Sequence, residues 1–306
     1  MGATATGKTE VAVELCERFP LDIISVDSAL VYRHMDIGTA KPDAATLRIA
    51  PHQLIDIREP EQTYSAGDFV RDANAAIATS HAQGRIPILV GGTMMYFRAL
   101  TDGIAELPGG DASVRKQIDE LASERGWPAM HERLREIDPL AAARIKPHDS
   151  QRIQRALEVF EISGRSLSSW HESPRTRAAD ADTRFLKIAL DVAERSVLHH
   201  RIELRLDLMF KAGLVEEVAG LMRRPGLERD MPAMRSVGYR QVWTHLAGET
   251  TLAECQYRAL VATRQLAKRQ YTWLRSETDL FAVNALEAAK VDAISRYLGG
   301  ISPIFA

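Results

Sequence analysis

The sequence predicts an α/β protein in which a parallel sheet is flanked by helices and interrupted by an all-helical insertion. Over the first hundred residues, short apolar runs alternate with helical stretches, which is typical of a parallel sheet. The apolar runs are residues 23–26, 54–57 and 86–90. After the Leu-Pro-Gly-Gly break at 107–110, the segments 112–125, 128–136 and 150–163 are all helical. The apolar run 185–192 then predicts a strand that returns to the sheet.

Local signals set the boundaries of the other elements. A helix is expected over 8–19, and Ser65 with Asp68 forms a capping box that opens a helix ending near Gly84. Further helices are expected at 194–212, 214–223 and 251–275, and the tail after them is uninformative. The chain is therefore predicted to have three parts: residues 1–110 as the first half of the core, 111–184 as the helical insertion, and 185–306 as the core return and C-terminal helices.

Composition narrows the class of protein. The 306 residues include 39 Lys and Arg and 41 Asp and Glu, with 45% apolar and 26% charged residues. These values exclude a disordered chain, a collagen and a disulfide scaffold. We expect no transmembrane helix and no secretory signal, because no apolar run of the required length occurs. Cys16 and Cys255 stand alone, so we expect reduced thiols in a cytoplasmic protein and no zinc site.

Charge is unevenly distributed along the chain. Residues 1–110 contain 9 basic and 14 acidic side chains, whereas residues 195–275 contain 14 basic and 8 acidic ones. A basic C-terminal third on a nearly neutral chain favours an anionic partner larger than a metabolite. Chance scatter of surface charge is the alternative explanation.

The first nine residues contain a phosphate-binding motif. Residues 2–9 fit G-x-x-x-x-G-K-[ST] at every fixed position, which predicts a P-loop NTPase-like core. Glycines let backbone N–H groups converge on phosphate oxygens, Lys8 supplies a charge, and the Thr9 hydroxyl can hold Mg²⁺. The alternative is a Gly-rich turn that caps a helix. A P-loop normally follows a buried strand, and only Met1 precedes Gly2, so we expect the core to begin about one strand late.

Polar residues follow two of the predicted strands. Asp27 directly follows the apolar run 23–26, and Thr93 follows the apolar run 86–90 after two glycines. Carboxyl ends of parallel strands line the ligand crevice, so both should face the P-loop. Asp27 is then either a Mg²⁺ ligand or a base, unless it only caps a turn. On the 194–212 helix, Arg205 falls within the apolar stripe, which predicts an anion partner, a structural ion pair or a snorkelling side chain.

Eight sequence blocks together resemble one family. GATATGKT, SVDSALVY, MDIGTAKP, PHQLIDI, LVGGTMMYF, QRIQRALEV, RSVGYRQ and ATRQLAKRQYTWLR occur in the order found in bacterial tRNA dimethylallyltransferases, also called tRNA isopentenyltransferases. The likeness runs from Gly2 to about Arg275. Ala3 departs from the family pattern, in which Pro is common at that position, and this change should be tolerated.

The resemblance implies a reaction and its residues. The family transfers a dimethylallyl group from dimethylallyl diphosphate to the exocyclic amine of the adenosine 3′ of the anticodon, in tRNAs reading U-initial codons. Asp27 matches the family's base, and Arg205 matches its catalytic arginine. Lys8 and Thr9 would complete the catalytic set, with Mg²⁺ as cofactor and Thr9 as its ligand. The diphosphate site would comprise Gly2, Ala3, Thr4, Ala5, Thr6, Gly7, Lys8 and Thr9.

The resemblance also implies a surface for the tRNA anticodon arm. In the last predicted helix, cations interleave with aromatic residues, which suits phosphate contact and base stacking, although a solvated face has the same pattern. The expected contacts are Asp27, Ser28, Ala29, Leu30, Thr93, Arg115, Gln151, Arg152, Ile153, Gln154, Arg155, Arg235, Ser236, Val237, Gly238, Tyr239, Arg240, Lys268, Arg269, Gln270, Tyr271, Thr272, Trp273, Leu274 and Arg275. A monomer without membrane association is expected. Two alternatives remain open: a P-loop kinase acting on a nucleoside or small metabolite, and a catalytically silent RNA-binding module.

Overall fold

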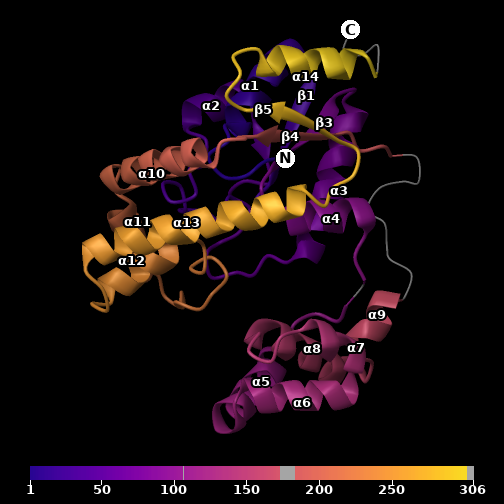
Figure 1. Ribbon diagram of the computed structural model, residues 1–306, viewed down its shortest axis with the longest axis vertical. Helices are drawn as coiled ribbons and strands as arrows, with labels where there is room; N and C mark the ends of the chain where they lie inside the picture. The colour runs from indigo at the N-terminus through magenta and orange to yellow at the C-terminus, as the bar shows by residue number, and fades with distance from the viewer. Residues whose placement is uncertain (106, 173–182, 302–306) are drawn as a thin grey trace. The chain divides into compact units, whose positions relative to one another are not determined.

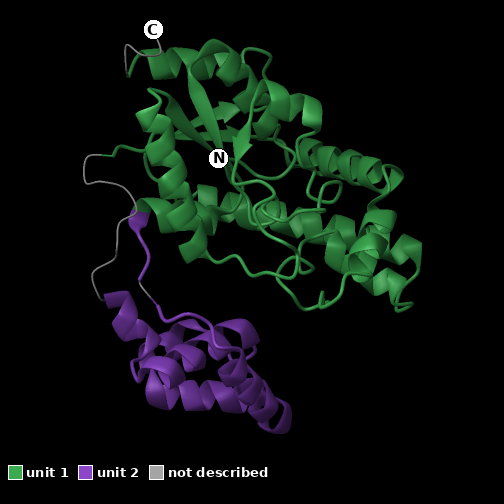
Figure 2. Cartoon of the chain, turned by 180° about the vertical axis from the view of Figure 1, so that it is seen from behind, with its two compact units in different colours: residues 1–101, 179–306 green, residues 102–178 purple. Residues whose placement is uncertain are grey.

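The computed structural model describes residues 1–105, 107–172 and 183–301. The chain divides into two compact units, one formed by residues 1–101 and 179–306 and the other by residues 102–178 (Figure 2). The larger unit is thus built from both ends of the chain, and the smaller one from a continuous segment. The junctions predicted from the sequence, at 110/111 and 184/185, each lie several residues after the observed junctions at 101/102 and 178/179.

The larger unit contains a three-stranded parallel sheet in the order β2–β1–β3 (Figure 1). Its strands are β1 (Leu21–Val26), β2 (His52–Gln53) and β3 (Ile86–Gly91). Ile23 of β1 lies opposite both His52 and Ile88, so the carboxyl ends of β1 and β3 meet at one edge of the sheet. The residues that follow these strands therefore emerge side by side.

A second parallel pair joins β4 (Lys187–Asp191) to β5 (Leu280–Asn284). The start of the chain runs along β4, because Gly2 forms a parallel bridge with Leu190 and the Met1 amino group donates to the Ile188 carbonyl at 2.7 Å. In the described part of the chain, β3 and β4 are not paired with each other.

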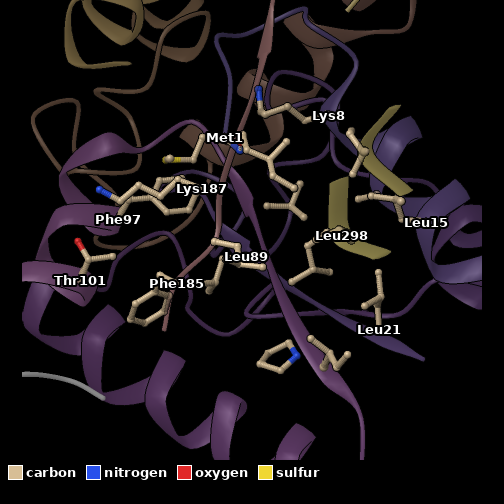
Figure 3. Close-up of a pocket in the computed structure, with 18 of the residues that line it drawn as sticks. Met1, Lys8, Leu15, Leu21, Leu89, Phe97, Thr101, Phe185, Lys187 and Leu298 are labelled. Carbon is tan, nitrogen blue, oxygen red and sulfur yellow. Dashed lines mark hydrogen bonds between the residues drawn. The ribbon is translucent and has the colours of Figure 1, made fainter. Parts of the chain in front are cut away.

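A cavity of about 280 Å³ lies between β3 and β4. Its lining is largely apolar, and Figure 3 shows Leu89, Phe185 and Leu298 around it. Met1 and Lys8 line the same cavity, so the loop of residues 2–9 borders it. At its start the loop is held by the short pairing of Met1 and Gly2 with β4.

Helices cover the two sheets of the larger unit. α1 and α3 pack on β1 and β3, and α14 packs on α1 and β5. A capping box between Ser65 and Asp68 begins α3, as predicted. Apolar side chains of α1 and α10, among them Leu15 and Ile202, share one core cluster with Leu190 of β4. The helices of this unit are α1 (Lys8–Arg18), α2 (Ala44–Ile49), α3 (Ala66–Ala82), α4 (Met94–Asp102), α10 (Arg195–Lys211), α11 (Leu214–Met222), α12 (Tyr239–Leu246), α13 (Leu252–Leu274) and α14 (Lys290–Gly299).

The smaller unit is built from helices, which are the elements found among its described residues. Its core is formed by apolar residues such as Ile118, Leu134 and Leu157, all nearly inaccessible to solvent. Aspartates begin three of its helices: Asp111, Asp138 and Asp149 each accept backbone N–H groups of the following turn, which satisfies donors that the helix leaves free. The helices are α5 (Ala112–Arg125), α6 (Trp127–Ile137), α7 (Pro139–Arg144), α8 (Ser150–Ser163) and α9 (Leu167–Glu172).

One sequence expectation needs correction. Residues 54–57 are not a strand: Leu54 and Asp56 adopt positive φ angles of 63° and 56°, which break an extended run, and β2 is confined to the two residues before them. The tail after 275, for which the sequence makes no prediction, contributes β5 and α14 to the larger unit. Its apolar residues Val283, Val291 and Ile294 join the same core cluster as α1.

Candidate functional site

The loop of residues 2–9 curls tightly before α1. Ala5 and Gly7 have positive φ angles of 63° and 82°, and Gly7 begins the helix without any side-chain cap. The Thr6 hydroxyl and the Lys8 ammonium both donate to the Ala3 carbonyl, at 2.9 and 2.6 Å. The first turn of α1 thus keeps uncapped N–H groups at the positive end of the helix dipole, as an anion site requires.

Two cations, Lys8 and Arg205, meet beside this loop with the carboxylates of Asp27 and Glu10 near them. Burial, followed by the nearby Arg205 charge, lowers the pKa of Lys8 to about 8, while Asp27 opposes the shift. Burial also lowers the pKa of Arg205, and Asp27 and Glu10 act in the opposite direction. Among the described residues, Arg205 makes no hydrogen bond or ion pair. A half-buried Lys–Arg pair with so little counter-charge favours an anionic ligand.

Asp27 leaves β1 with one oxygen already engaged. Its Oδ1 accepts the backbone N–H groups of Ala29 and Leu30, at 2.8 and 3.3 Å. Thr93, after β3, accepts the Ser28 backbone N–H at 3.0 Å through its hydroxyl. The structure therefore brings Asp27 and Thr93 together at one sheet edge and sets the Asp27 side chain near Lys8 and Arg205. The second carboxylate oxygen of Asp27 has no partner within the described residues.

The long helix α13 crosses the same edge of the larger unit (Figure 1). Gln270 is buried there and is hydrogen-bonded to both Thr4 and Gly92, and the Tyr271 hydroxyl accepts the Val192 backbone N–H at 3.1 Å. Leu274 is buried as well. The side chains of Gln270 and Leu274 therefore belong to the interior, and their contact with RNA stays a prediction. The exposed residues of this stretch are Lys268, Arg269, Thr272 and Arg275, and Trp273 lies half-buried under Arg98.

A second cavity, of about 390 Å³, lies between α10, α13 and the β4–β5 pair. Burial and the charges of Arg264 and Arg195 lower the pKa of His199 in its wall. The only carboxylate in the lining is Asp191. The basic side chains of the lining are Arg195, Arg264, Lys268 and Arg275, together with the neutral-leaning His199. This cavity places the predicted basic residues Lys268 and Arg275 beside Arg195 of α10.

The predicted residues 235–240 form a turn and the start of α12. Tyr239 is fully buried, and its hydroxyl donates to Glu217 at 2.5 Å. Glu217 also accepts the backbone N–H groups of residues 36–38, at 2.9, 2.8 and 3.2 Å. Tyr239 therefore has a structural role in this fold, and its contact with RNA stays a prediction. Arg235 and Arg240 are exposed, Ser236 and Val237 are half-buried, and Gly238 is buried.

In the smaller unit, most of the residues predicted to contact RNA form ion pairs, hydrogen bonds or core contacts with other residues of the same unit. Glu158 is completely buried, and Arg115 and Arg155 donate to it at 2.8 and 2.7 Å. Ile153 is a core residue, and Gln154 donates to Asp119 at 2.7 Å. Arg152 pairs with Asp149, and Gln151 is exposed. The Ile153 side chain therefore has a core role, and the contact of these residues with RNA stays a prediction.

Arg201 was not predicted, yet it contacts the loop directly. Its Nε donates to the Ala5 carbonyl at 2.8 Å, one turn before Arg205 on α10. The i,i+4 spacing of Arg201 and Arg205 could have predicted this contact, since it places both side chains on one face of the helix. Gln270 was assigned to RNA because it lies within a basic stretch, and no local pattern indicates a buried amide.

The described residues contain no group of three or more His, Cys, Asp or Glu side chains that could hold a metal ion. Cys16 and Cys255 are both free thiols. No helix in the described ranges has the length and apolar character needed to cross a membrane. Any metal at the loop would therefore need ligands from the bound anion as well as from the protein.

Comparison with known proteins identifies the family. The sequence profile of "IPP transferase" matches residues 30–277. The chain is 56% identical to a tRNA dimethylallyltransferase of Thiobacillus denitrificans over 90% of this chain and 87% of that one. It is 50% identical to the enzyme of the same name from Cupriavidus taiwanensis, over 97% and 93% of the two chains.

A crystal structure of the full-length tRNA isopentenylpyrophosphate transferase from Bacillus halodurans has the same fold. It superposes with a TM-score of 0.70 at 35% identity, covering 98% of this chain and 94% of that one. The α/β architecture with a parallel sheet is therefore shared with that enzyme. The profile spans most of the chain and the relatives match nearly its full length, so this chain belongs to the IPP transferase family.

Proposed function

We propose that this protein transfers a dimethylallyl group from dimethylallyl diphosphate to the exocyclic amine of the adenosine 3′ of the anticodon. The substrates would be tRNAs that read U-initial codons, and the second product is diphosphate. The observation that supports this chemistry best is the half-buried Lys8–Arg205 pair opposite the Asp27 carboxylate. An anion beside the cations and a nucleophile beside the carboxylate are what the reaction needs.

Asp27 is assigned as the base. An adenine amine is a weak nucleophile because its lone pair is delocalised into the ring. As the new C–N bond forms, its proton can pass to the Asp27 oxygen that the backbone leaves free. The Ala29 and Leu30 N–H groups hold the other oxygen and keep the carboxylate oriented. Since the adenosine must reach this site, it has to leave its stack in the anticodon loop.

Lys8, Arg205 and the loop are assigned to the leaving group. As the allylic C–O bond breaks, charge develops on the bridging oxygen of the diphosphate. Lys8 and Arg205 can stabilise this developing negative charge strongly, because few negative groups of the protein compete for the two cations. The uncapped N–H groups of α1 add to the same effect. By this assignment the core works as a P-loop-like fold that binds the donor diphosphate and not ATP.

The donor set at the loop suits Mg²⁺. The Thr9 hydroxyl makes no hydrogen bond to any described residue, and a single hydroxyl plus diphosphate oxygens is a usual environment for this ion. When bound, Mg²⁺ would neutralise charge on the diphosphate. Thr9 would hold the ion, while Lys8 and Arg205 bind the oxygens that remain.

The anticodon arm is assigned to the basic face of α13 and to the helical insertion, residues 102–178. Lys268 and Arg269 of α13 and its C-cap Arg275 are exposed, and the cavity beside them is also lined by Arg195 of α10 and Arg264. Such a surface suits phosphates of a folded RNA. We further propose that the protein acts as a cytoplasmic monomer.

Label transfer tests the proposed function. Dimethylallyl diphosphate carrying an isotopic label in the allyl group is incubated with the protein, Mg²⁺ and an anticodon stem-loop, and the RNA is counted. We expect label in the RNA only when an adenosine follows the anticodon, with an adenosine-to-guanosine stem-loop as control. Consumption of ATP without labelling would indicate the kinase alternative, which the family assignment does not favour.

A further inference from the structure

Gln270 of α13 forms a bridge between two walls of the site. The Thr4 backbone N–H donates to Gln270 Oε1 at 2.8 Å, and Gln270 Nε2 donates to the Gly92 carbonyl at 2.9 Å. A backbone N–H can only donate and a carbonyl can only accept, so the orientation of the amide is fixed by its partners. The side chain is also 8% exposed, and water cannot easily replace either bond.

The contact with Gly92 leaves no spare room. A Cβ atom placed on Gly92 would lie 2.4 Å from Gln270 Nε2, so the amide reaches this carbonyl only because residue 92 is a glycine. Gly92 is followed by Thr93, whose hydroxyl holds the Ser28 N–H next to Asp27. One amide therefore connects the anion loop at Thr4 to the strand end that leads to the base.

The same helix carries the basic surface. Gln270 lies two residues from the exposed Lys268 and five from the exposed Arg275, and α13 is a continuous helix of 23 residues. Tyr271 binds the Val192 N–H at the end of β4, so consecutive residues fix α13 to two separate segments of the core. A helix held in this way moves as a unit, and any shift at its exposed face reaches Thr4.

We propose that Gln270 is a positioning residue that couples RNA binding on α13 to anion binding in the loop of residues 2–9. RNA that holds α13 in place also holds the two hydrogen bonds of Gln270, which keeps the Thr4 segment in its binding conformation. By thermodynamic reciprocity, an anion in the loop must strengthen RNA binding by the same factor. This inference rests on the proposed function, because it takes diphosphate and the anticodon arm as the two ligands.

Calorimetry on the full chain tests the coupling. Inorganic diphosphate with Mg²⁺ is titrated into the protein alone and into the protein saturated with the anticodon stem-loop. We expect the RNA to tighten diphosphate binding about fivefold or more, the lower end of usual allosteric coupling. Gln270→Leu should bring this ratio to about one. Gln265→Leu, the same change at an exposed position of α13, should leave the ratio unchanged.

Two further variants guard against simple unfolding. Gln270→Glu keeps the acceptor for Thr4 but sets a carboxylate against the Gly92 carbonyl, and Gly92→Ala displaces the amide from the other side. Both should fold, by circular dichroism, and both should reduce the ratio. A wild-type ratio of one, or a full ratio in the Gln270 and Gly92 variants, overturns the inference. If wild-type protein labels RNA but shows no coupling, only this inference fails; if it never labels RNA, the proposed function fails.

Discussion

The two units of this protein differ in how their basic side chains are paired with carboxylates. In the smaller unit, Arg115 and Arg155 both reach the buried carboxylate of Glu158, and the three groups satisfy one another. In the larger unit, Lys8 and Arg205 lie close together, and burial and mutual repulsion lower the pKa of Lys8. The first arrangement stabilises a fold, and the second is stabilised only when an anion arrives. Missing counter-charge is thus the physical mark that separates the site from the scaffold.

The largest effect is expected from Asp27→Asn. An amide cannot accept the proton of the adenine amine, so the single-turnover rate of label transfer should fall about 10³-fold. RNA affinity should stay within a few-fold, because the backbone bonds of residues 29 and 30 can still be accepted by the amide oxygen. Rapid-quench transfer and filter binding measure the two quantities. Undiminished turnover would remove Asp27 from the mechanism.

Glu158→Gln tests the paired side of the comparison. Loss of the carboxylate leaves two partly solvated arginines with a neutral partner, and the smaller unit should lose about 2 kcal/mol of stability. Hydrogen exchange of the α5 and α8 amides measures this loss within the unit. Glu161→Gln is the matched control, since its exposed pair with Arg133 should contribute less than about 1 kcal/mol. Equal effects of the two changes would contradict the structural role given to Glu158.

Arg205→Met tests the unpaired side. The transfer rate should fall about 100-fold, because a cation that stabilises the leaving diphosphate is lost. The melting temperature of the anion-free protein should hold or rise, since burying a cation without a partner costs stability. Transfer assays and calorimetric scans report the two effects. A variant that merely unfolds would instead make Arg205 a structural residue.

A smaller effect concerns pH. With a pKa of about 8, Lys8 loses its charge as pH rises above this value in the anion-free protein. Bound diphosphate favours the charged form and raises the pKa, so binding above pH 8 must take up a proton, and affinity should fall by up to about tenfold per pH unit. Calorimetry in buffers of different ionisation enthalpy measures this uptake. Lys8→Arg should remove the part of the pH dependence of diphosphate affinity that comes from Lys8. If the pH profile of this variant is unchanged, the dependence comes from titration of the ligand.

The smallest effect is expected on the outer face of α13. Lys268→Ala and Arg275→Ala should each weaken stem-loop binding a few-fold and lower the slope of log affinity against log salt by about one. Thr272→Val, on the same exposed face, should change neither quantity. Binding isotherms at several salt concentrations give both values. An unmoved slope would place the RNA elsewhere.

How much the sequence predicts depends on the range of the interactions involved. The capping box at Ser65 and the strand that ends before Thr93 depend on neighbours in sequence, and both are found where they were expected. The turn at 54–57 reads as a strand because its residues are apolar, and only tertiary contacts impose the positive φ angles at Leu54 and Asp56. Local propensity is overruled in such places.

In the candidate site, too, the features set by neighbours in sequence could be predicted and those set by distant contacts could not. Residues 2–9 are recognisable because the loop's function lies in the chain's own glycines and lysine. Burial of Tyr239 and Gln270 was missed, because their partners Glu217 and Gly92 are far away in sequence. Helical phase placed Arg205 on the inner face of α10 correctly, but phase does not reveal that Arg201 holds the Ala5 carbonyl.

The division of the chain into a continuous and a discontinuous unit also orders its folding during synthesis. Residues 102–178 can close their helical core as soon as they leave the ribosome, because all their partners are near in sequence. The bond between Met1 and Ile188 joins residues 187 positions apart, so the anion loop stays without its β4 support until that strand is made. The loop and α1 are therefore synthesised before β4 and are completed only after it.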